Sequence, residues 1–431
     1  MKVLVASMPG DGHFNPLTGI AVGLRDRGHR VRWYAGARYA PRVERLGIEV
    51  LPYRRATELM AEDLNEVFPE RAHLRGPKRL SFDLEKFFVS NVEAHYLDIA
   101  DFHRHHAFDV LLCDGALYAE RLVNDALGLP TVAVALSTVV PDPQGPPPFF
   151  GLRPARTPLH RLLHVVVRRM VANTNKAGVV AYNEVLARHG VAAIAPDGFP
   201  AEPMLGLPRI LLNASPGMEF ADYRPPANAE WLGPLVPARR EAAPASVELP
   251  ETVTDPAATV VAVSQGTVDN TDTAKLIGPT LEALAGGPYV VVATTGGSDT
   301  AALRRRYAGS TVHVEDYIDF DALFPHVDVF VTNGGYGSII QALRHGIPVV
   351  SAGTREGKND NNARLAARGL GINLRTERPK PRRIARAVET VLREPRFRAA
   401  VEGIRAEFAS YDTIGLVERA LLTAAGEVAV P

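Results

Sequence analysis

The chain alternates short apolar runs with helix-like segments, and it does so in two separate series. In the first series, strand-like runs occupy residues 2–7, 31–35, 110–113 and 131–135, and residues 17–27 have helical apolar spacing. In the second series, strand-like runs occupy residues 259–263, 289–294, 311–314, 327–332 and 349–352, with helices at 273–284, 338–345 and 361–368. Repeated strand–helix–strand order predicts a parallel sheet with helices on both faces. The two series therefore predict an α/β protein with two Rossmann-like halves.

A segment without periodicity separates the two series. Residues 236–250 are rich in proline, alanine and charged side chains, which is typical of a linker. We therefore expect an N-terminal domain over residues 1–235 and a C-terminal domain over residues 251–410. Three helices are expected between residues 379 and 425, and we keep open whether the helix within 411–431 returns to the N-terminal domain. Two such halves place a cleft between the carboxyl ends of two sheets, where open α/β sheets bind their ligands.

The charge balance and the hydropathy pattern argue against polyanionic and membrane partners. Lys plus Arg and Asp plus Glu are equal at 48 each, so no net field recruits nucleic acid or an anionic membrane. No stretch reaches the roughly 18–20 apolar residues of a membrane span. The single cysteine, Cys113, cannot form an internal disulfide, and its apolar neighbours predict burial. We therefore expect a cytoplasmic protein without nucleic-acid partners or stable membrane insertion, and a homodimer is left open.

One segment of the first half has two interpretations. A helix over residues 158–172 carries leucines and valines on one side and Arg161, Arg168 and Arg169 on the other. Such a helix could lie on a membrane surface. Alternatively, it packs over the N-terminal domain and walls a pocket, which the balanced overall charge favours.

A glycine-rich turn follows the apolar run at 327–331. It reads Thr332-Asn333-Gly334-Gly335-Tyr336-Gly337-Ser338 and leads into a helix. Glycines let a ligand approach the backbone, and the helix start offers unpaired N–H groups that suit phosphate. Many α/β folds need glycine there simply to turn, so a structural role is the alternative.

Two further polar loops follow strands of the second half. Residues 264–270, Ser-Gln-Gly-Thr-Val-Asp-Asn, form a second short glycine turn, which could add donors around one diphosphate or simply be capped by Asp269 or Asn270. Residues 353–362 follow the run at 349–352 and are dense in polar groups. Such a loop suits a polyhydroxylated ligand, although a solvated loop is the alternative for any single residue.

The first strand is followed by a loop that contains His13, within Gly10-Asp11-Gly12-His13-Phe14-Asn15-Pro16. An imidazole titrates near neutrality, with an ordinary pKa of about 6.5, which suits a general base. A base histidine needs a partner that stabilises the imidazolium, and Asp114 follows the strand-like run 110–113 at the same sheet edge. The alternatives are a loop or capping histidine and a helix-capping aspartate.

Metal and cofactor motifs are missing from the sequence. His105 and His106 are adjacent, so their rings diverge on a helix, and no Walker motif, nucleophile elbow or Asp-x-Asp occurs. The first turn lacks the G-x-G-x-x-G spacing of NAD(P) oxidoreductases. We expect no metal and no cofactor.

Taken together, these residues resemble family 1 glycosyltransferases of the GT-B fold over most of the chain. That family begins with a Gly-His-x-x-Pro loop, which here is Gly12 to Pro16. Its donor motif, His-x-Gly-x-x-Ser/Thr-x-x-Glu, falls on Asn333, Gly335, Ser338 and Gln341. The turn Ser264-Gln265-Gly266-Thr267 is similar to its Ser-x-Gly-Ser/Thr element. Tyr317-Ile318-Asp319-Phe320 stands where the family has Trp-x-Pro-Gln, whose aromatic residue stacks on the nucleotide base.

The departures from the family pattern concern the donor. Asn333 replaces a phosphate-contacting histidine, and Gln341 replaces a glutamate that binds ribose. The Asp-Gln pair that grips the donor sugar is absent, and Glu356-Gly357-Lys358-Asn359 occupies its loop. These differences leave the donor sugar and the choice between UDP and dTDP open, with Lys358 or Arg355 as a substitute positive charge near the diphosphate.

The resemblance implies an inverting, metal-independent hexosyltransferase with a nucleotide-diphosphate sugar as its second substrate. His13 would be the base and Asp114 its support. The implied donor residues are Gly12, Gln265, Gly266, Thr267, Tyr317, Ile318, Asn333, Gly334, Gly335, Gly337, Ser338, Gln341, Glu356, Lys358 and Asn359. Phe14, Phe149 and Phe150 would contact a largely apolar small-molecule acceptor, such as a polyketide or macrolide. The alternatives are a GT-B-type sugar-nucleotide epimerase and a non-catalytic sugar-nucleotide binding protein.

Overall fold

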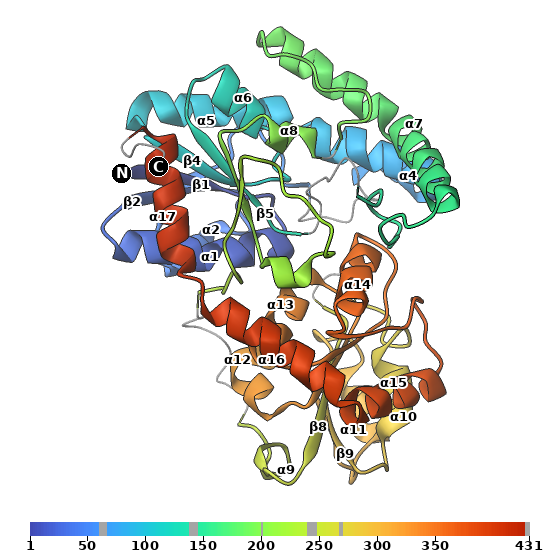
Figure 1. Cartoon of the computed structure of the whole chain (residues 1–431). Coiled ribbons are helices and arrows are strands. Elements are labelled where there is room, and N and C mark those ends of the chain that lie inside the picture. The colour runs from blue at the N-terminus through green and yellow to red at the C-terminus, as the bar shows by residue number, and fades with distance from the viewer. Residues whose placement is uncertain (60–66, 138–144, 200, 239–247, 267–269, 427–431) are drawn as a thin grey trace.

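The computed structural model describes the whole chain except residues 60–66, 138–144, 200, 239–247, 267–269 and 427–431. It has two halves, each with one parallel sheet between helices (Figure 1). The N-terminal sheet has the order β3-β2-β1-β4-β5-β6-β7. Its strands are β1 Lys2–Ala6, β2 Arg30–Ala35, β3 Glu49–Pro52, β4 Val110–Asp114, β5 Thr131–Ala135, β6 Arg209–Leu212 and β7 Ala229–Trp231.

The C-terminal sheet has the order β10-β9-β8-β11-β12-β13. Its strands are β8 Thr259–Ser264, β9 Tyr289–Thr294, β10 Val312–Glu315, β11 Val329–Thr332, β12 Val349–Ser351 and β13 Gly371–Asn373. Two parallel Rossmann-like sheets with flanking helices confirm the predicted α/β fold.

Helices connect the strands in both halves. In the N-terminal half they are α1 Asp11–Asp26, α2 Ala40–Arg45, η2 Pro69–His73, α4 Gly76–Asp83, the π-helical η3 Leu84–Val89, α5 Val92–His106, α6 Glu120–Asp125, α7 Pro158–Arg188, α8 Glu202–Leu205 and η4 Pro216–Met218. In the remainder they are α9 Glu251–Thr254, α10 Ile277–Leu284, α11 Thr300–Arg306, α12 Phe320–Leu323, η5 Phe324–His326, α13 Tyr336–Arg344, α14 Lys358–Ala367, α15 Pro381–Arg393, α16 Pro395–Ala409 and α17 Thr413–Ala424.

The continuous apolar runs of the sequence become strands that are buried on both faces. Along β1, Leu4 and Ala6 belong to one buried cluster, whereas Val3 and Val5 belong to another on the opposite face. Successive side chains of a strand point to opposite faces, so helices that cover both faces require apolar residues at every position. The free Cys113 in β4 is buried in the first of these clusters.

The first helix begins earlier than the sequence pattern predicted. We expected a loop as far as Pro16, whereas α1 begins at Asp11 and includes His13 and Pro16. Gly10 precedes the helix in an extended conformation, and the amides of His13 and Phe14 donate to its carbonyl. His13 therefore lies on the first turn of a helix and not in a loop.

The final helix packs on the N-terminal half. After α16 crosses the C-terminal half, α17 lies beside α1 (Figure 1). Its Val417, Ala420 and Leu421 are buried in the same cluster as Leu17 and Leu24 of α1. Gly23 of α1 leaves room for Ile414, because a side chain at this glycine would overlap with it.

The helix expected over residues 158–172 is the start of the much longer α7. Its first turns do not pack as we expected: Leu159 and Leu162 are 72% and 59% exposed, and Val166 is also exposed. The later turns, with Val179 and Tyr182, are buried in the core. None of the described helices is both long enough and apolar enough to cross a membrane.

Candidate functional site

His13 and Asp114 lie together at the carboxyl edge of the N-terminal sheet. His13 is on the first turn of α1, which follows β1, and Asp114 is the last residue of the neighbouring β4. Nδ1 of His13 lies 2.8 Å from Oδ2 of Asp114, a contact that meets the distance of a hydrogen bond but not its alignment. Catalytic pairs without substrate often have such imperfect geometry. The structure therefore brings these two residues together as a dyad.

The carboxylate is fixed more firmly than the imidazole. The Asp114 side chain is 2% exposed and accepts from the amides of Met8 (3.2 Å) and Ala116 (2.9 Å). The His13 side chain is 34% exposed, so a ligand can reach it. Burial lowers the pKa of His13, but the charge and contact of Asp114 outweigh burial and raise this pKa above its ordinary value of 6.5. The pair can thus accept a proton and stabilise the imidazolium that forms.

An apolar cluster includes the two residues whose amides hold Asp114. Met8 and Ala116, whose amides hold Asp114, belong to an apolar cluster with Leu59, Val67, Phe68, Phe87 and Phe88. Four of its members, Val67, Phe68, Phe88 and Ala116, are only partly buried. This apolar cluster was not predicted from the sequence, although the stretch Leu84-Glu85-Lys86-Phe87-Phe88 contains two adjacent aromatic residues. Its π-helical conformation is a further signal, because such turns often mark functional sites.

A second carboxyl group is buried near the dyad. Glu120, on the first turn of α6, is fully buried, and its carboxylate oxygens make no well-aligned hydrogen bond within the described residues. Burial raises the pKa of Glu120 well above its usual range, and the charge of Asp114 adds to the rise. Burial therefore favours the protonated, uncharged form of Glu120.

We expect Glu120→Gln to stabilise the protein increasingly as pH rises. The folded state favours the protonated form of Glu120 more than the unfolded chain does, so the wild type loses stability as pH rises from the unfolded to the folded pKa, by at most about 1.4 kcal/mol per pH unit. Glutamine has nearly the same shape as glutamate but cannot ionise, so the variant does not lose this stability. Urea unfolding of both proteins between pH 5 and 8 measures the difference, and a difference that does not change with pH would contradict the assignment.

In the C-terminal half, the glycine turn lies where β11 meets α13. Gly334 has a left-handed backbone with φ of +95°, and a side chain there would overlap with the amide of Asn362. Asn361 and Asn362, on the first turns of α14, donate to the carbonyls of Gly334 (3.0 Å) and Asn333 (3.4 Å). These contacts hold the carbonyls of the turn toward α14.

The amides at the start of α13 are left for a ligand. Gly335 caps the helix, and the amides of Tyr336, Gly337 and Ser338 make no hydrogen bond within the described residues. Nothing lies within 4 Å of the position that a side chain at Gly337 would occupy, so the space beside it is open. A helix start with free N–H groups and open space suits a phosphate group.

The two glycine turns lie side by side, because β8 and β11 are neighbours in the sheet. Asn333 connects them: its amide donates to the Gln265 carbonyl, and its oxygen accepts from the Gly335 amide at 3.2 Å. Gly266 has φ of +79° and approaches the Asn333 side chain. Thr267 lies outside the described residues.

Two predicted donor residues have side chains that are used elsewhere. Gln265 is buried, and its side-chain oxygen accepts from the amides of Leu276 and Ile277 at the start of α10 (3.0 and 2.9 Å). The Ile318 side chain is buried in the C-terminal core. The side chains of Gln265 and Ile318 thus have structural roles, and donor contact through these two residues stays a prediction. Tyr317 is 43% exposed, and Gln341 of α13 is partly exposed, so both remain accessible.

The first turn of α14 contacts the N-terminal half. Asp360 accepts from the amides of Phe149 and Gly151, the latter at 2.7 Å, and Asn359 donates to the Phe149 carbonyl. Burial raises the pKa of Asp360, although these amide donors favour its charged form. Lys358 is buried and pairs with Glu356 at 2.7 Å. Asn359 thus joins the two halves in this structure.

The structure also revises the predicted acceptor residues. Phe14 is buried in the N-terminal core, where its ring centroid lies 4.8 Å from Trp33 and 4.9 Å from Tyr39, so it does not face the cleft. It was expected to contact the acceptor because it follows His13, but helix geometry turns the next side chain to another face. Phe149 joins the halves through its backbone, and Phe150 is 41% exposed. Gly12 has open space around it.

The carboxyl edges of the two sheets meet at the first residue of α13. The Tyr336 hydroxyl donates to the carbonyl of Asn213, just after β6, at 2.6 Å. The glycine turn and the dyad therefore belong to facing edges. Within the described residues, no group of three or more His, Cys, Asp or Glu side chains is placed to hold a metal ion.

Comparison with known proteins supports a common origin along the whole chain. Residues 290–420 match the model of the erythromycin biosynthesis protein CIII-like C-terminal domain. The chain is 34% identical over 419 residues to the 4'-demethylrebeccamycin synthase of Lentzea aerocolonigenes, covering 96% of this chain and 97% of the relative. It is 27% identical over 429 residues to UDP-glycosyltransferase 2 of Phaeomoniella chlamydospora, covering 96% and 93%.

A solved structure shows the same fold. The glycosyltransferase VinC, in complex with dTDP, superposes with a TM-score of 0.69 at 20% identity, covering 99% of this chain and 100% of VinC.

Proposed function

The chain belongs to the natural-product glycosyltransferases of the GT-B fold, which use nucleotide-diphosphate sugars, and we propose that it transfers the sugar with inversion of configuration at the anomeric carbon and with His13 as the general base. UDP-glycosyltransferase 2 and VinC are named as glycosyltransferases, so the epimerase and the non-catalytic binding protein are set aside. The observation that carries the proposal is the 2.8 Å contact between His13 and Asp114 beside partly buried apolar side chains.

The dyad accounts for the movement of the proton. His13 takes the proton of an acceptor hydroxyl, and the oxygen forms a bond to the anomeric carbon while the bond from that carbon to the diphosphate breaks. Asp114 stabilises the resulting imidazolium because its carboxylate lies against Nδ1, which leaves Nε2 as the atom that receives the proton. Attack from the side opposite the diphosphate inverts the configuration.

The start of α13 stabilises the leaving nucleotide. The amides of Tyr336, Gly337 and Ser338 and the positive end of the helix dipole supply charge stabilisation that requires no metal. Asn333 has a different role from the family's histidine, because it connects the two glycine turns and offers no charge. Tyr317 stacks on the base, and Gln341 meets the ribose.

The apolar cluster forms the acceptor side. Val67, Phe68 and Phe88 are only partly buried, and the amides of Met8 and Ala116 connect the cluster to Asp114. An apolar wall beside the base suits a bulky, largely apolar small molecule with one reacting hydroxyl. The aromatic rings can stack on a planar acceptor.

Nucleotide binding should depend on Asn333 as a connector of the turns. We expect the preferred nucleoside diphosphate, UDP or dTDP, to raise the melting temperature of the wild type by a few degrees at saturation. Asn333→His should melt lower and show a smaller shift with either nucleotide, because a histidine cannot make both hydrogen bonds.

A thermal-shift panel of UDP, dTDP and their sugars tests this expectation. Asn228→His is the matched control, since Asn228 also donates to carbonyls, those of Leu205 and Leu207, but lies in the other half. Asn228→His should show the same nucleotide-induced rise in melting temperature as the wild type. A larger shift in Asn333→His than in the wild type would show that a phosphate-contacting charge had been restored, against our assignment.

A further inference from the structure

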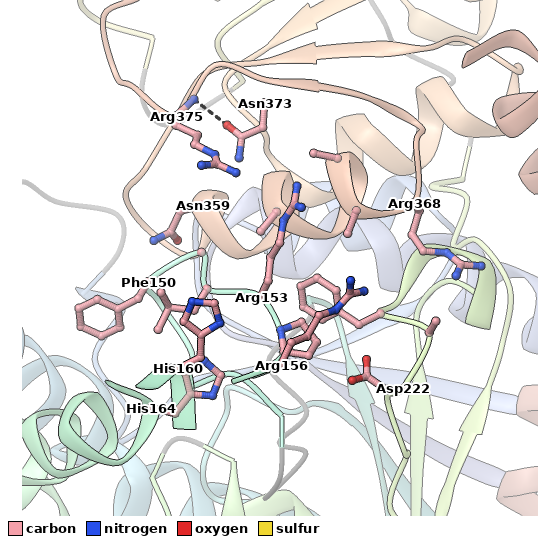
Figure 2. Close-up of a pocket in the computed structure, with 18 of the residues that line it drawn as sticks. Phe150, Arg153, Arg156, His160, His164, Asp222, Asn359, Arg368, Asn373 and Arg375 are labelled. Atoms are coloured by element: carbon pink, nitrogen blue, oxygen red, sulfur yellow. Dashed lines mark hydrogen bonds between the residues drawn. The ribbon is translucent and has the colours of Figure 1, made fainter. Parts of the chain in front are cut away.

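A cavity of about 920 Å³ lies between the two halves, and the proposed chemistry does not use it. The N-terminal half contributes residues 150–156, the start of α7 and residues 220–224 (Figure 2). The C-terminal half contributes one side of α14 and the segments after β12 and β13. His13, Asp114 and the glycine turn at 333–338 do not line this cavity, whereas Asn359 and Phe150 do.

The two sides of α14 separate this cavity from the glycine turn. Asn361 and Asn362 face the turn, to which they donate. Ala363, Ala366 and Ala367 line the cavity instead. The cavity is therefore a different site from the proposed seat of the diphosphate.

The cavity is strongly basic. Its lining includes two histidines, one carboxylate, Asp222, and five arginines: Arg153, Arg156, Arg224, Arg368 and Arg375. None of these five guanidinium groups is within ion-pair distance of a carboxylate in the described parts of the chain. Within the described residues, the guanidinium groups of Arg224 and Arg368 donate to backbone carbonyls, those of Tyr223 (3.2 Å) and Gly217 (2.9 Å).

Unpaired arginines are not the rule at this boundary. On the same helix α14, Arg364 is buried and pairs with Glu219 of the N-terminal half at 2.5 Å. Like charges that gather without counter-charge repel one another, and in a cavity they focus a positive potential. An anionic ligand would relieve this repulsion.

We propose that this cavity is a second ligand site, which binds an organic polyanion carrying phosphate or carboxylate groups. Guanidinium groups bind both kinds of group through paired hydrogen bonds. Arg153 and Arg156 line the cavity from the N-terminal half, and Arg368 and Arg375 line it from the C-terminal half (Figure 2). Phe150, Leu163 and Phe220 supply apolar contact for the body of the ligand.

Binding at this site couples to the arrangement of the two halves. Because each half supplies part of the positive charge, the polyanion favours the arrangement that brings these arginines together. The polyanion therefore changes how the two halves are arranged around the cleft without binding in the cleft itself. The inference does not depend on which sugar or acceptor the enzyme uses.

Thermal shift and calorimetry with pyrophosphate and with citrate test the site, at constant ionic strength set by sodium chloride. We expect both probes to raise the melting temperature of the wild type by a few degrees. Arg156→Ala/Arg368→Ala/Arg375→Ala should bind at least about tenfold more weakly, since each lost charge-assisted contact costs about a factor of ten. If citrate alone or pyrophosphate alone shows this pattern, the ligand is a carboxylate or a phosphate compound, respectively.

Arg161→Ala/Arg169→Ala is the matched control, because both arginines lie on α7 but do not line the cavity. The control should bind both probes like the wild type. Equal weakening in both variants would show a general charge effect and overturn the proposal. Unchanged pyrophosphate and citrate binding in the triple variant would place the anion elsewhere, such as at the start of α13, and would also overturn it.

Discussion

Replacing His13 with alanine should lower the turnover of sugar transfer by about 10²- to 10⁴-fold, the usual contribution of a positioned general base. The loss should fall on turnover and not on nucleotide affinity, because His13 belongs to α1 of the N-terminal half and the glycine turns belong to the C-terminal half. Steady-state kinetics with a hydroxyl acceptor and calorimetric titration of the nucleoside diphosphate measure the two quantities separately. Wild-type turnover in His13→Ala would remove the histidine from the mechanism.

Asp114→Asn distinguishes a base from a merely structural histidine. The base must be neutral, so transfer should rise with pH through the pKa of His13, which Asp114 holds above its ordinary value. Without the carboxylate the imidazolium loses its stabilisation, so the acid limb of the pH profile should move to lower pH while the maximal rate falls. If the acid limb of the pH profile lay at the same pH in Asp114→Asn as in the wild type, its position would not be set by the pKa of His13.

Replacing Gly334 with alanine should destroy the donor site. Gly334 has φ of +95°, and a methyl group there would overlap with the Asn362 amide that holds the turn. The backbone conformation alone costs about 1–3 kcal/mol for a residue with a side chain, and the overlap adds to this cost. We expect lower stability in urea and loss of nucleotide binding, measured by calorimetry on the folded fraction.

Gly337→Ala is the matched control for the effect of this substitution on stability. Gly337 lies in the first turn of α13, has ordinary helical geometry and has open space around it. Alanine there should leave the unfolding free energy unchanged or slightly raised. If Gly334→Ala were as stable as Gly337→Ala and kept full nucleotide affinity, the turn would not need its left-handed residue.

The buried strands could be predicted from the sequence because both faces of each sheet are covered. The runs at 131–135 and 289–294 coincide with β5 and β9. The short strands β3, β6, β7 and β13 were missed, since three or four residues at or near a sheet edge carry little apolar signal. For α1, α13 and α14, the predicted start lies several residues after the observed start. These helices begin with polar or glycine residues that belong to the site and carry no apolar periodicity.

Part of the site was predictable because strand order alone brings its residues together. His13 and Asp114 follow neighbouring strands, and so do the two glycine turns. Contacts that depend on the packing of distant segments were not predictable. The burial of Phe14, the capping role of Gln265 and the bridge from Asp360 to Phe149 depend on elements that meet only in the folded chain.

The position of α17 has a consequence for how the protein is made. The chain leaves the ribosome from its N-terminus, yet the apolar surface of α1 is covered by Val417 and Leu421 near the other end. The apolar face of α1 that α17 covers therefore stays uncovered while about 180 further residues are synthesised and folded. Because α17 follows the C-terminal half in the chain, the N-terminal half gains this packing only after the C-terminal half has been synthesised.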